Sequence, residues 1–213
     1  MTRRARAGLY TPCLVEGDAV GNDVLGMADV LACHGWDVRV FAGTSSDSTA
    51  AVRRPWEIPS FLDDADDMFI YHHSASSPEG VDLLRRLRCR RVVKYHNVTP
   101  PAFFSGFSSL YERSCRDGRE QLETLCRLGL DMYLADSVFD MNELLPMLSA
   151  ASRHTVVPPF HRIERLLSGS AGVRALSDSI PLILCVGRIV PNKNHRMLIE
   201  SIGFLCGEYG TSV

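Results

Sequence analysis

The sequence has 213 residues, of which 46% are hydrophobic and 23% are charged. This length is enough for one full domain, or for one domain and part of a second, and the composition is ordinary for a soluble globular protein. Because the formal net charge is only −2, no global field attracts nucleic acid or an anionic membrane, and no nucleic-acid partner is expected.

Seven cysteines are scattered along the chain without a C-x-x-C pair, and several lie inside apolar runs. This usage is typical of reduced, buried cysteines and argues against a disulfide framework or a zinc site. The basic start is followed by an apolar stretch that Pro12 and Glu16 interrupt, so it is too short for a signal peptide. No apolar run approaches the roughly 18 residues of a membrane span. We therefore expect a cytoplasmic protein without a transmembrane segment.

The first predicted unit consists of a strand, a glycine-containing loop, a helix and a second strand. Residues 8–15 form the apolar run of the first strand. Gly17 and Gly21 follow, and glycines let the backbone approach a ligand closely. Asn22 is expected to cap the helix, whose apolar residues recur at positions i, i+3, i+4 and i+7.

Alternating strands and helices continue through the next hundred residues. Residues 43–66, rich in Ser, Asp and Pro, are expected to form a polar connection with little regular structure. Further strands are predicted over 36–42, 68–71, 91–95, 131–135 and 154–157, with helices over 78–87, over 105–128 and after residue 137. Ser137, next to Asp136, is expected to be the N-cap of the last helix, with Asp140 three residues on. About six strands alternating with helices imply a doubly wound, Rossmann-like parallel sheet.

Histidines occur at the ends of two predicted strands. His96 directly follows a strand, and the active sites of open α/β sheets lie at this carboxyl edge. His72 and His73 are adjacent, so on an extended chain they face opposite sides of the sheet. At least one of this pair is therefore expected to be a packing or hydrogen-bonded histidine.

A second unit begins after a stretch rich in Ser, Gly and Arg. Five apolar residues, 182–186, predict a strand buried on both faces, and Gly187 ends it. Arg188 and Lys193 then lie five residues apart in a loop, before a helical pattern that starts near His195. A guanidinium with its fork of donors and an ammonium with its point charge suit a diphosphate.

These pieces together resemble a family-4 (group 1) retaining glycosyltransferase of the GT-B fold, in which two Rossmann-like domains face each other across a cleft. The resemblance covers nearly the whole chain. The matching segments, each at the end of a predicted strand, are 17–23, 71–74, 95–101, 134–137 and 186–188 with Lys193. The expected domains are an N-terminal GT-B domain over 1–160, a linker over 161–180 and the start of a nucleotide-sugar-binding domain over 181–213.

The resemblance also implies roles for individual residues. Arg188 and Lys193 would bind the diphosphate of the donor and stabilise the departing nucleoside diphosphate. The loop from Gly17 to Gly21 would bring backbone N–H groups toward the donor phosphates or the sugar. His96 would be the catalytic residue near the reacting sugar, and the acceptor side would be lined by Asp18, His72 and His73. No metal and no cofactor are implied, because the two cations replace magnesium and the nucleotide sugar is a co-substrate.

Structural alternatives exist for the same residues. A glycine-rich loop after the first strand is common to all Rossmann-like proteins, and Arg188 and Lys193 can pair with surface acids. A dinucleotide-binding protein is disfavoured, because Gly17, Gly21 and Gly26 lack the G-x-G-x-x-G spacing.

The sequence departs from this family near its end. The family's second domain supplies a nucleotide pocket and two glutamates separated by seven residues, whereas only 18 residues follow His195. Glu200 and Glu208 have that spacing but lie on the first helix of the unit and its tail, too early for the motif. A single βα unit would leave the strand over 182–186 with unpaired edges and exposed apolar faces. The segment is therefore expected to pack on the first domain, to be covered by a partner, or to remain loosely ordered and prone to aggregation.

Two functions are compatible with these observations. The first is a hexosyltransferase-like enzyme that moves a sugar from a nucleotide sugar to an unknown carbohydrate or lipid-linked acceptor with retention. It is expected to be inactive as this isolated chain, which lacks the acidic donor-site motif. The second is a non-catalytic product, either a truncated relic or a module that binds an acceptor or a partner.

Overall fold

The computed structural model describes residues 3–15, 17–46, 52–161 and 183–209. Its body is built on a six-stranded parallel sheet in the order β2-β1-β3-β4-β5-β6. The strands are β1 (Arg6–Leu14), β2 (Asp37–Ser45), β3 (Met68–His73), β4 (Arg90–Tyr95), β5 (Met132–Ala135) and β6 (His154–Val156). The predicted α/β class with a Rossmann-like parallel sheet is confirmed, and the six strands predicted between residues 8 and 157 lie within a few residues of those observed.

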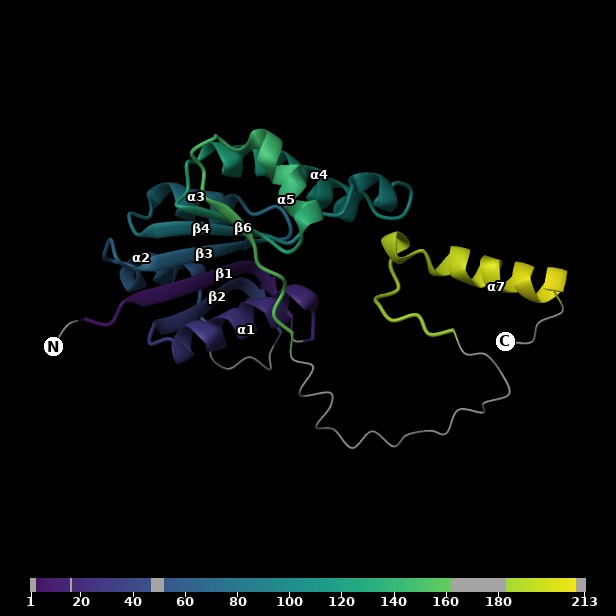
Figure 1. Cartoon of the computed structure of the whole chain (residues 1–213), viewed down its shortest axis with the longest axis horizontal. Coiled ribbons are helices and arrows are strands. Elements are labelled where there is room, and N and C mark those ends of the chain that lie inside the picture. Colours follow the sequence, from purple (N-terminus) through teal and green to yellow (C-terminus); the bar gives the residue numbers. More distant parts are fainter. Residues whose placement is uncertain (1–2, 16, 47–51, 162–182, 210–213) are drawn as a thin grey trace, which may run out of the picture.

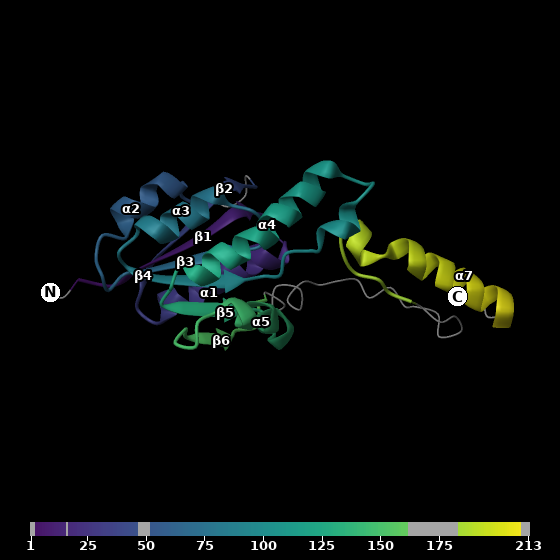
Figure 2. The ribbon, with the colours of Figure 1, turned by 90° about the horizontal axis from the view of Figure 1, so that it is seen from above.

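Helices cover both faces of this sheet, as Figures 1 and 2 show. One face carries α1 (Ala19–Cys33). The other carries α2 (Ile58–Phe61), α3 (Pro78–Arg86), α4 (Ser109–Arg127) and α5 (Val138–Leu144), with the short turns η1 (Pro55–Glu57), η2 (Pro101–Phe104) and η3 (Leu145–Met147). None of the helices in the described ranges is long and apolar enough to cross a membrane.

Two apolar layers follow from the alternation of side chains along each strand. Between the sheet and α1 lie fully or almost fully buried residues that include Leu9, Val24, Met27, Ile70 and Val92. On the opposite face, large aromatic side chains fill the space under α2 and α3, among them Tyr10, Phe41, Phe69 and Tyr71. Burial of such side chains is the main stabilising term of the body.

Serine side chains cap three of the helices. Ser77, Ser108 and Ser137 each accept a hydrogen bond from the backbone N–H three residues on. This satisfies one of the N–H groups that the first turn of a helix leaves without a partner. The cap predicted at Ser137 is therefore confirmed.

The connection over 43–66 is more ordered than its composition predicts. It contains η1 and α2, and Arg53 forms an isolated parallel bridge with Phe41. The reason is apolar anchoring, because Ile58, Phe61 and Leu62 are at most 4% exposed and pack into the core. Residues 47–51 lie outside the described residues.

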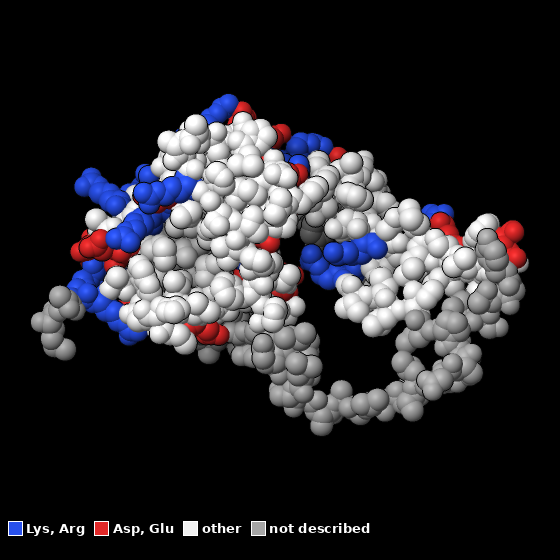
Figure 3. Space-filling model, viewed as in Figure 1, with Lys and Arg blue, Asp and Glu red and all other residues white. Residues whose placement is uncertain are grey.

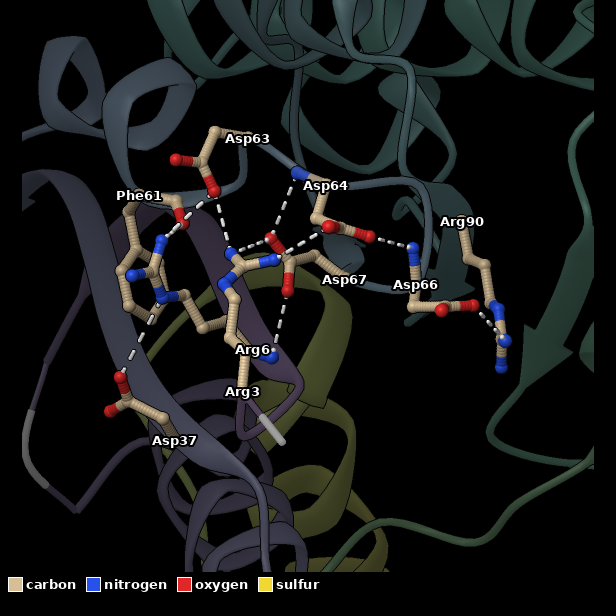
Figure 4. Close-up of polar contacts among 9 residues, drawn as sticks. All are labelled: Arg3, Arg6, Asp37, Phe61, Asp63, Asp64, Asp66, Asp67 and Arg90. Carbon is tan, nitrogen blue, oxygen red and sulfur yellow. Dashed lines mark hydrogen bonds and ion pairs between the residues drawn. The ribbon is translucent and has the colours of Figure 1, made fainter. Parts of the chain in front are cut away.

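Ion pairs hold together the amino edge of the sheet (Figure 4). The Arg3 guanidinium lies 2.6 Å from Asp63, 3.0 Å from Asp64 and 2.8 Å from Asp67. The fully buried carboxylate of Asp67 also accepts the backbone N–H of Arg6 at 2.9 Å. This network fixes the start of β1 against the turn before β3, at the edge opposite to the one where ligands of α/β sheets bind.

The C-terminal segment differs from its prediction. Ile183–Val186 forms no strand, and Leu184 and Val186 are 78% and 84% exposed. No neighbouring strand pairs with these residues in the described part of the chain, and an apolar run without a ladder partner does not become a strand. The turn η4 (Pro191–Lys193) and the expected helix, α7 (His195–Tyr209), do follow. Apart from His161, the linker expected over 161–180 lies outside the described residues, and the division into domains stays a prediction.

Candidate functional site

The carboxyl edge of the sheet has a topological switch point between β1 and β3. The chain leaves β1 to form β2 on one side and then returns to form β3 on the other. In open α/β sheets, ligands bind outside the strand ends at such a point. Below this edge, on the side of α1, three ionisable side chains of the described residues are completely buried: Asp23 of α1, His72 of β3 and Lys94 of β4.

Asp23 lies at the centre of this group. Its Oδ1 accepts hydrogen bonds from Lys94 Nζ and from the backbone N–H of Phe160, both at 2.7 Å. Its Oδ2 lies 3.3 Å from His72 Nδ1 and 3.4 Å from His96 Nε2. One carboxylate therefore joins α1 to β3, to β4 and to the segment after β6.

His96 and Asp136 complete the group, which we call the edge cluster (Asp23, His72, Lys94, His96 and Asp136). His96 Nε2 lies 2.9 Å from His72 Nδ1, and His96 Nδ1 lies 2.9 Å from Asp136 Oδ2. The two imidazole rings stack with their centroids 5.1 Å apart. Lys94 Nζ is also 3.5 Å from Asp136 Oδ1, so the five side chains form a closed network.

Burial and charge determine the ionisation of the cluster. Burial lowers the pKa of His72 to about 4, although Asp23 acts in the opposite direction. Burial alone would raise the pKa of Asp23, but contacts with His72 and Lys94 outweigh it and lower this pKa to about 2. Near neutral pH the cluster therefore holds an ionised Asp23 and a neutral His72. Three of its buried atoms, Asp23 Oδ2, His72 Nε2 and Asp136 Oδ1, make no hydrogen bond within the described residues.

His73 lies on the opposite face, as the alternation along a strand predicts. Its Nδ1 is 2.9 Å from the Tyr71 hydroxyl and its Nε2 is 2.9 Å from the Gly118 carbonyl. Burial lowers the pKa of His73 to about 4. The Nε2 contact thus ties β3 to α4, and the Nδ1 contact stays within β3, so both ring nitrogens are used away from the edge cluster.

The predicted glycine loop is only partly a loop. Gly17 has a φ of +81°, which favours glycine, and Asp18 is the half-buried N-cap residue of α1. Gly21 instead lies inside α1, where an added Cβ would come within 2.2 Å of the Val15 carbonyl oxygen. Asn22 is therefore not the N-cap, which corrects the sequence interpretation. The absent side chain of Gly21 lets the helix pack on the chain's own backbone.

Arg188 and Lys193 lie in the C-terminal segment and are exposed. Their loop is closed by backbone hydrogen bonds from Val190 to Arg188 and from Lys193 to Val190, both at 3.0 Å. Within the described ranges neither side chain forms an ion pair, and neither touches the edge cluster. Figure 3 shows basic side chains at the end of this segment that is nearest to the α/β body.

His96 is enclosed within the edge cluster. Its side chain is 2% exposed and both of its nitrogens contact other members of the cluster. His96 and His72 are thus brought together, while Asp18 and Gly17 lie at the nearby loop. The structure does not bring His73, Arg188 or Lys193 to the cluster.

Asp23 and Lys94 are members that the sequence interpretation missed, and Asp136 was expected only beside a helix cap. Lys94 interrupts the apolar run of β4, and a lysine inside a buried strand needs an acidic partner. Asp23 stands on the buried side of α1, next to Val24. Asp23 and Lys94 are each unusual among their apolar neighbours in the sequence. Their pairing, however, joins residues that are 71 positions apart, so no local sequence pattern predicts it.

An apolar groove lies beside α1, on the face of the sheet where no described helix covers β4 and β5. It has a volume of about 400 Å³, and its walls include Met27, Val30, Val92, Met132, Leu134 and Phe160. Neither this groove nor the hollow at the amino edge contains Arg188 or Lys193.

No protein-family model matches the sequence, and no curated protein matches it. Among solved structures, the chain is similar to an α-glucosyltransferase in complex with UDP and a 13-mer DNA containing an HMU base. The identity is 17%, the TM-score is 0.49, and the match covers 74% of this chain and 43% of that chain. A second similar structure is an α-glucosyltransferase in complex with UDP-glucose and DNA containing an abasic site. Here the identity is 16%, the TM-score is 0.45, and the match covers 72% of this chain and 42% of that chain. The chain thus spans less than half the length of these structures.

The expectation of no nucleic-acid partner is contradicted by these structures. Three of the similar glucosyltransferase structures contain DNA. The expectation rested on the net charge of the whole chain, and a small net charge does not exclude a local surface for a polyanion. It is withdrawn.

Proposed function

We propose that this chain contains the amino-terminal lobe of a GT-B-type glycosyltransferase that uses a nucleotide sugar, followed by the first elements of its donor lobe. The supporting observation is the position of the edge cluster. Charged groups that are completely buried lie directly under the β1–β3 switch point, next to the loop at Gly17 and the start of α1. Such a cluster keeps the carboxyl edge of the sheet rigid, and a sugar substrate can bind at that edge.

Roles follow from exposure and hydrogen bonding. Asp18 is half-buried at the switch point and its side chain makes no capping hydrogen bond, so it is available to a sugar hydroxyl on the acceptor side. The side chain of His96 is enclosed within the cluster. We assign it a positioning role, in which it holds the carboxyl edge of the sheet in place beneath the sugar. Arg188 and Lys193 are exposed without ion-pair partners in the described residues, and they bind the donor diphosphate.

The finer features of the proposal come from the family resemblance. The sugar is transferred with retention to a carbohydrate or lipid-linked acceptor, and the reaction takes place in the cytoplasm. Transfer requires both lobes, so the activity is proposed for the two-lobe protein.

Binding of nucleoside diphosphates tests the proposal on the chain itself. Two cations without a nucleoside pocket give weak binding, and we expect a dissociation constant of about 1 mM, or roughly −4 kcal/mol. The double variant Arg188→Ala/Lys193→Ala should lose at least tenfold in affinity in an NMR titration. The matched control Arg196→Ala removes a neighbouring exposed cation that pairs with Glu200 and should bind as the wild type does. Equal affinities of the wild type and the double variant would contradict the assignment.

A non-catalytic partner-binding module is the second candidate, and the apolar groove beside α1 favours it. Under this alternative the chain associates through the groove, and Leu134→Lys abolishes association in sedimentation experiments. Association without any binding of nucleoside diphosphates would favour the module over the transferase.

A further inference from the structure

We propose that Asp23, His72 and His96 form a binding site for a divalent transition-metal ion, with zinc as the preferred ion. The site lies inside the edge cluster and is independent of whether the protein transfers sugars. Asp23 contributes Oδ2, His72 contributes Nδ1 and His96 contributes Nε2.

The spacing of these three atoms fits one common ion. Their separations are 3.3 Å, 3.4 Å and 2.9 Å. A circle through three atoms at these separations has a radius of about 1.9 Å, slightly less than the bond lengths of roughly 2.0–2.1 Å that zinc forms with imidazole nitrogen and carboxylate oxygen. A point just outside the plane of the three atoms is therefore at bonding distance from all of them.

An unsatisfied carboxylate oxygen supports the same conclusion independently. Asp23 Oδ2 is completely buried and accepts no hydrogen bond within the described residues, although two imidazole nitrogens lie within 3.4 Å. These nitrogens are near enough to donate but are not aligned to do so. A buried acceptor without a partner is costly, and a shared metal ion removes that cost.

Surrounding contacts hold the ligands in the required orientation. Lys94 and the Phe160 N–H bind Asp23 Oδ1, which leaves Oδ2 as a monodentate ligand. Asp136 accepts the hydrogen bond of His96 Nδ1, so the lone pair of Nε2 faces Asp23 and His72. Metal-binding histidines usually make this type of contact to a carboxylate through the second ring nitrogen.

Charge and ligand type determine which ion fits. The ammonium of Lys94 opposes a cation, but the carboxylates of Asp23 and Asp136 offset it. His72 would bind through Nδ1 and leave its buried Nε2 proton without a partner, which limits the affinity. Two imidazoles with one carboxylate suit zinc and its neighbours, whereas magnesium prefers oxygen ligands. The proposed ion is therefore different from magnesium, whose role at the donor diphosphate would be taken by Arg188 and Lys193.

The test uses the full chain freed of metal with a chelator. Zinc should bind in a 1:1 ratio by calorimetry, and a hundredfold excess over the dissociation constant should raise the Tm by about 5 °C or more. Cobalt(II) should give the electronic spectrum of a nitrogen–oxygen site without thiolate bands, which separates this site from binding by free cysteines. No Tm shift with zinc, or a cobalt spectrum dominated by thiolate, would overturn the proposal.

Variants locate the ion. His96→Gln should abolish the cobalt spectrum, and Asp136→Asn should weaken zinc binding about 10- to 100-fold because it removes the negative charge of the carboxylate that contacts His96. The matched control is His73→Gln, which changes a buried histidine of β3 that lies next to His72 but outside the site and should leave the cobalt spectrum unchanged. If His96→Gln does not fold, Asp136→Asn still decides, because unchanged zinc affinity in that variant would contradict the assignment. Loss of the spectrum in His73→Gln at retained folding would also contradict it.

Discussion

The α/β body and the C-terminal segment use similar amino acids with different results. Apolar runs in the body become strands, because each finds a neighbouring strand and a covering helix. Ile183–Val186 is just as apolar but remains exposed and without regular structure. Charged residues show the same contrast, since Lys94 is completely buried and paired while Arg188 is exposed. Secondary structure in this chain is therefore decided by the surroundings of a run more than by its composition.

The largest expected effect comes from breaking the buried pair of the body. Asp23→Ala leaves the ammonium of Lys94 without its closest partner and should cost about 3–5 kcal/mol in the free energy of unfolding. The matched change in the C-terminal segment is Glu200→Ala, which breaks an exposed pair with Arg196 and should cost less than about 0.5 kcal/mol. Urea denaturation measures both, and similar values would remove the distinction between the two regions.

Acid should destabilise the body through its buried histidines. In the folded chain the pKa values of His72 and His73 are lowered to about 4, whereas in the unfolded chain they are about 6.5. As the pH falls below about 6.5, the unfolded chain therefore binds protons that the folded chain does not bind. Stability should therefore be constant above pH 6.5 and decrease toward pH 4, by up to about 3 kcal/mol for each histidine. Urea midpoints measured across this range test the slope, and His73→Gln should reduce it. A slope that is flat, or equal in the variant, would show that these histidines titrate normally.

Two glycine substitutions compare helix packing in the two regions. In Gly21→Ala the new Cβ would meet the Val15 carbonyl, so α1 must move, at a cost of about 1–3 kcal/mol. In Gly203→Ala nothing lies within 4 Å of the new Cβ, and the helix propensity of alanine should stabilise α7 by up to about 1 kcal/mol. Thermal unfolding of the first and helix content of the second by circular dichroism measure these effects. A neutral Gly21→Ala would mean that α1 does not pack on the loop as described.

The smallest effect is expected in the exposed apolar run. Val186→Ala should change stability by less than about 0.5 kcal/mol, because this side chain is 84% exposed. The matched core change is Val93→Ala, at 3% exposure, which should cost roughly 1–3 kcal/mol. Destabilisation by Val186→Ala comparable to that of Val93→Ala would show that the run is covered in solution.

The sequence predicted those features that depend on local patterns. Strand positions and the Ser137 cap followed from apolar runs and capping preferences. The start of α1 was missed because glycine has a low helix propensity, so Gly21 was expected before the helix. In the structure Gly21 lies inside α1, because only a residue without a side chain can pack closely on the Val15 carbonyl. Asp23 and Lys94 escaped because their pairing depends on how α1 crosses β4, which no local pattern specifies. A strand was expected over 182–186 because the run is apolar. Residues 183–186 form no strand, because no neighbouring strand of the described residues pairs with them.

Mapping of nucleoside diphosphate binding by NMR tests the central claim most directly. We predict that backbone amide signals of Arg188 and Lys193 shift together with those of Gly17 and Asp18, because the proposed function makes the donor cations and the switch point parts of one site. Signal shifts confined to other regions, such as the apolar groove beside α1, would contradict the proposed transferase.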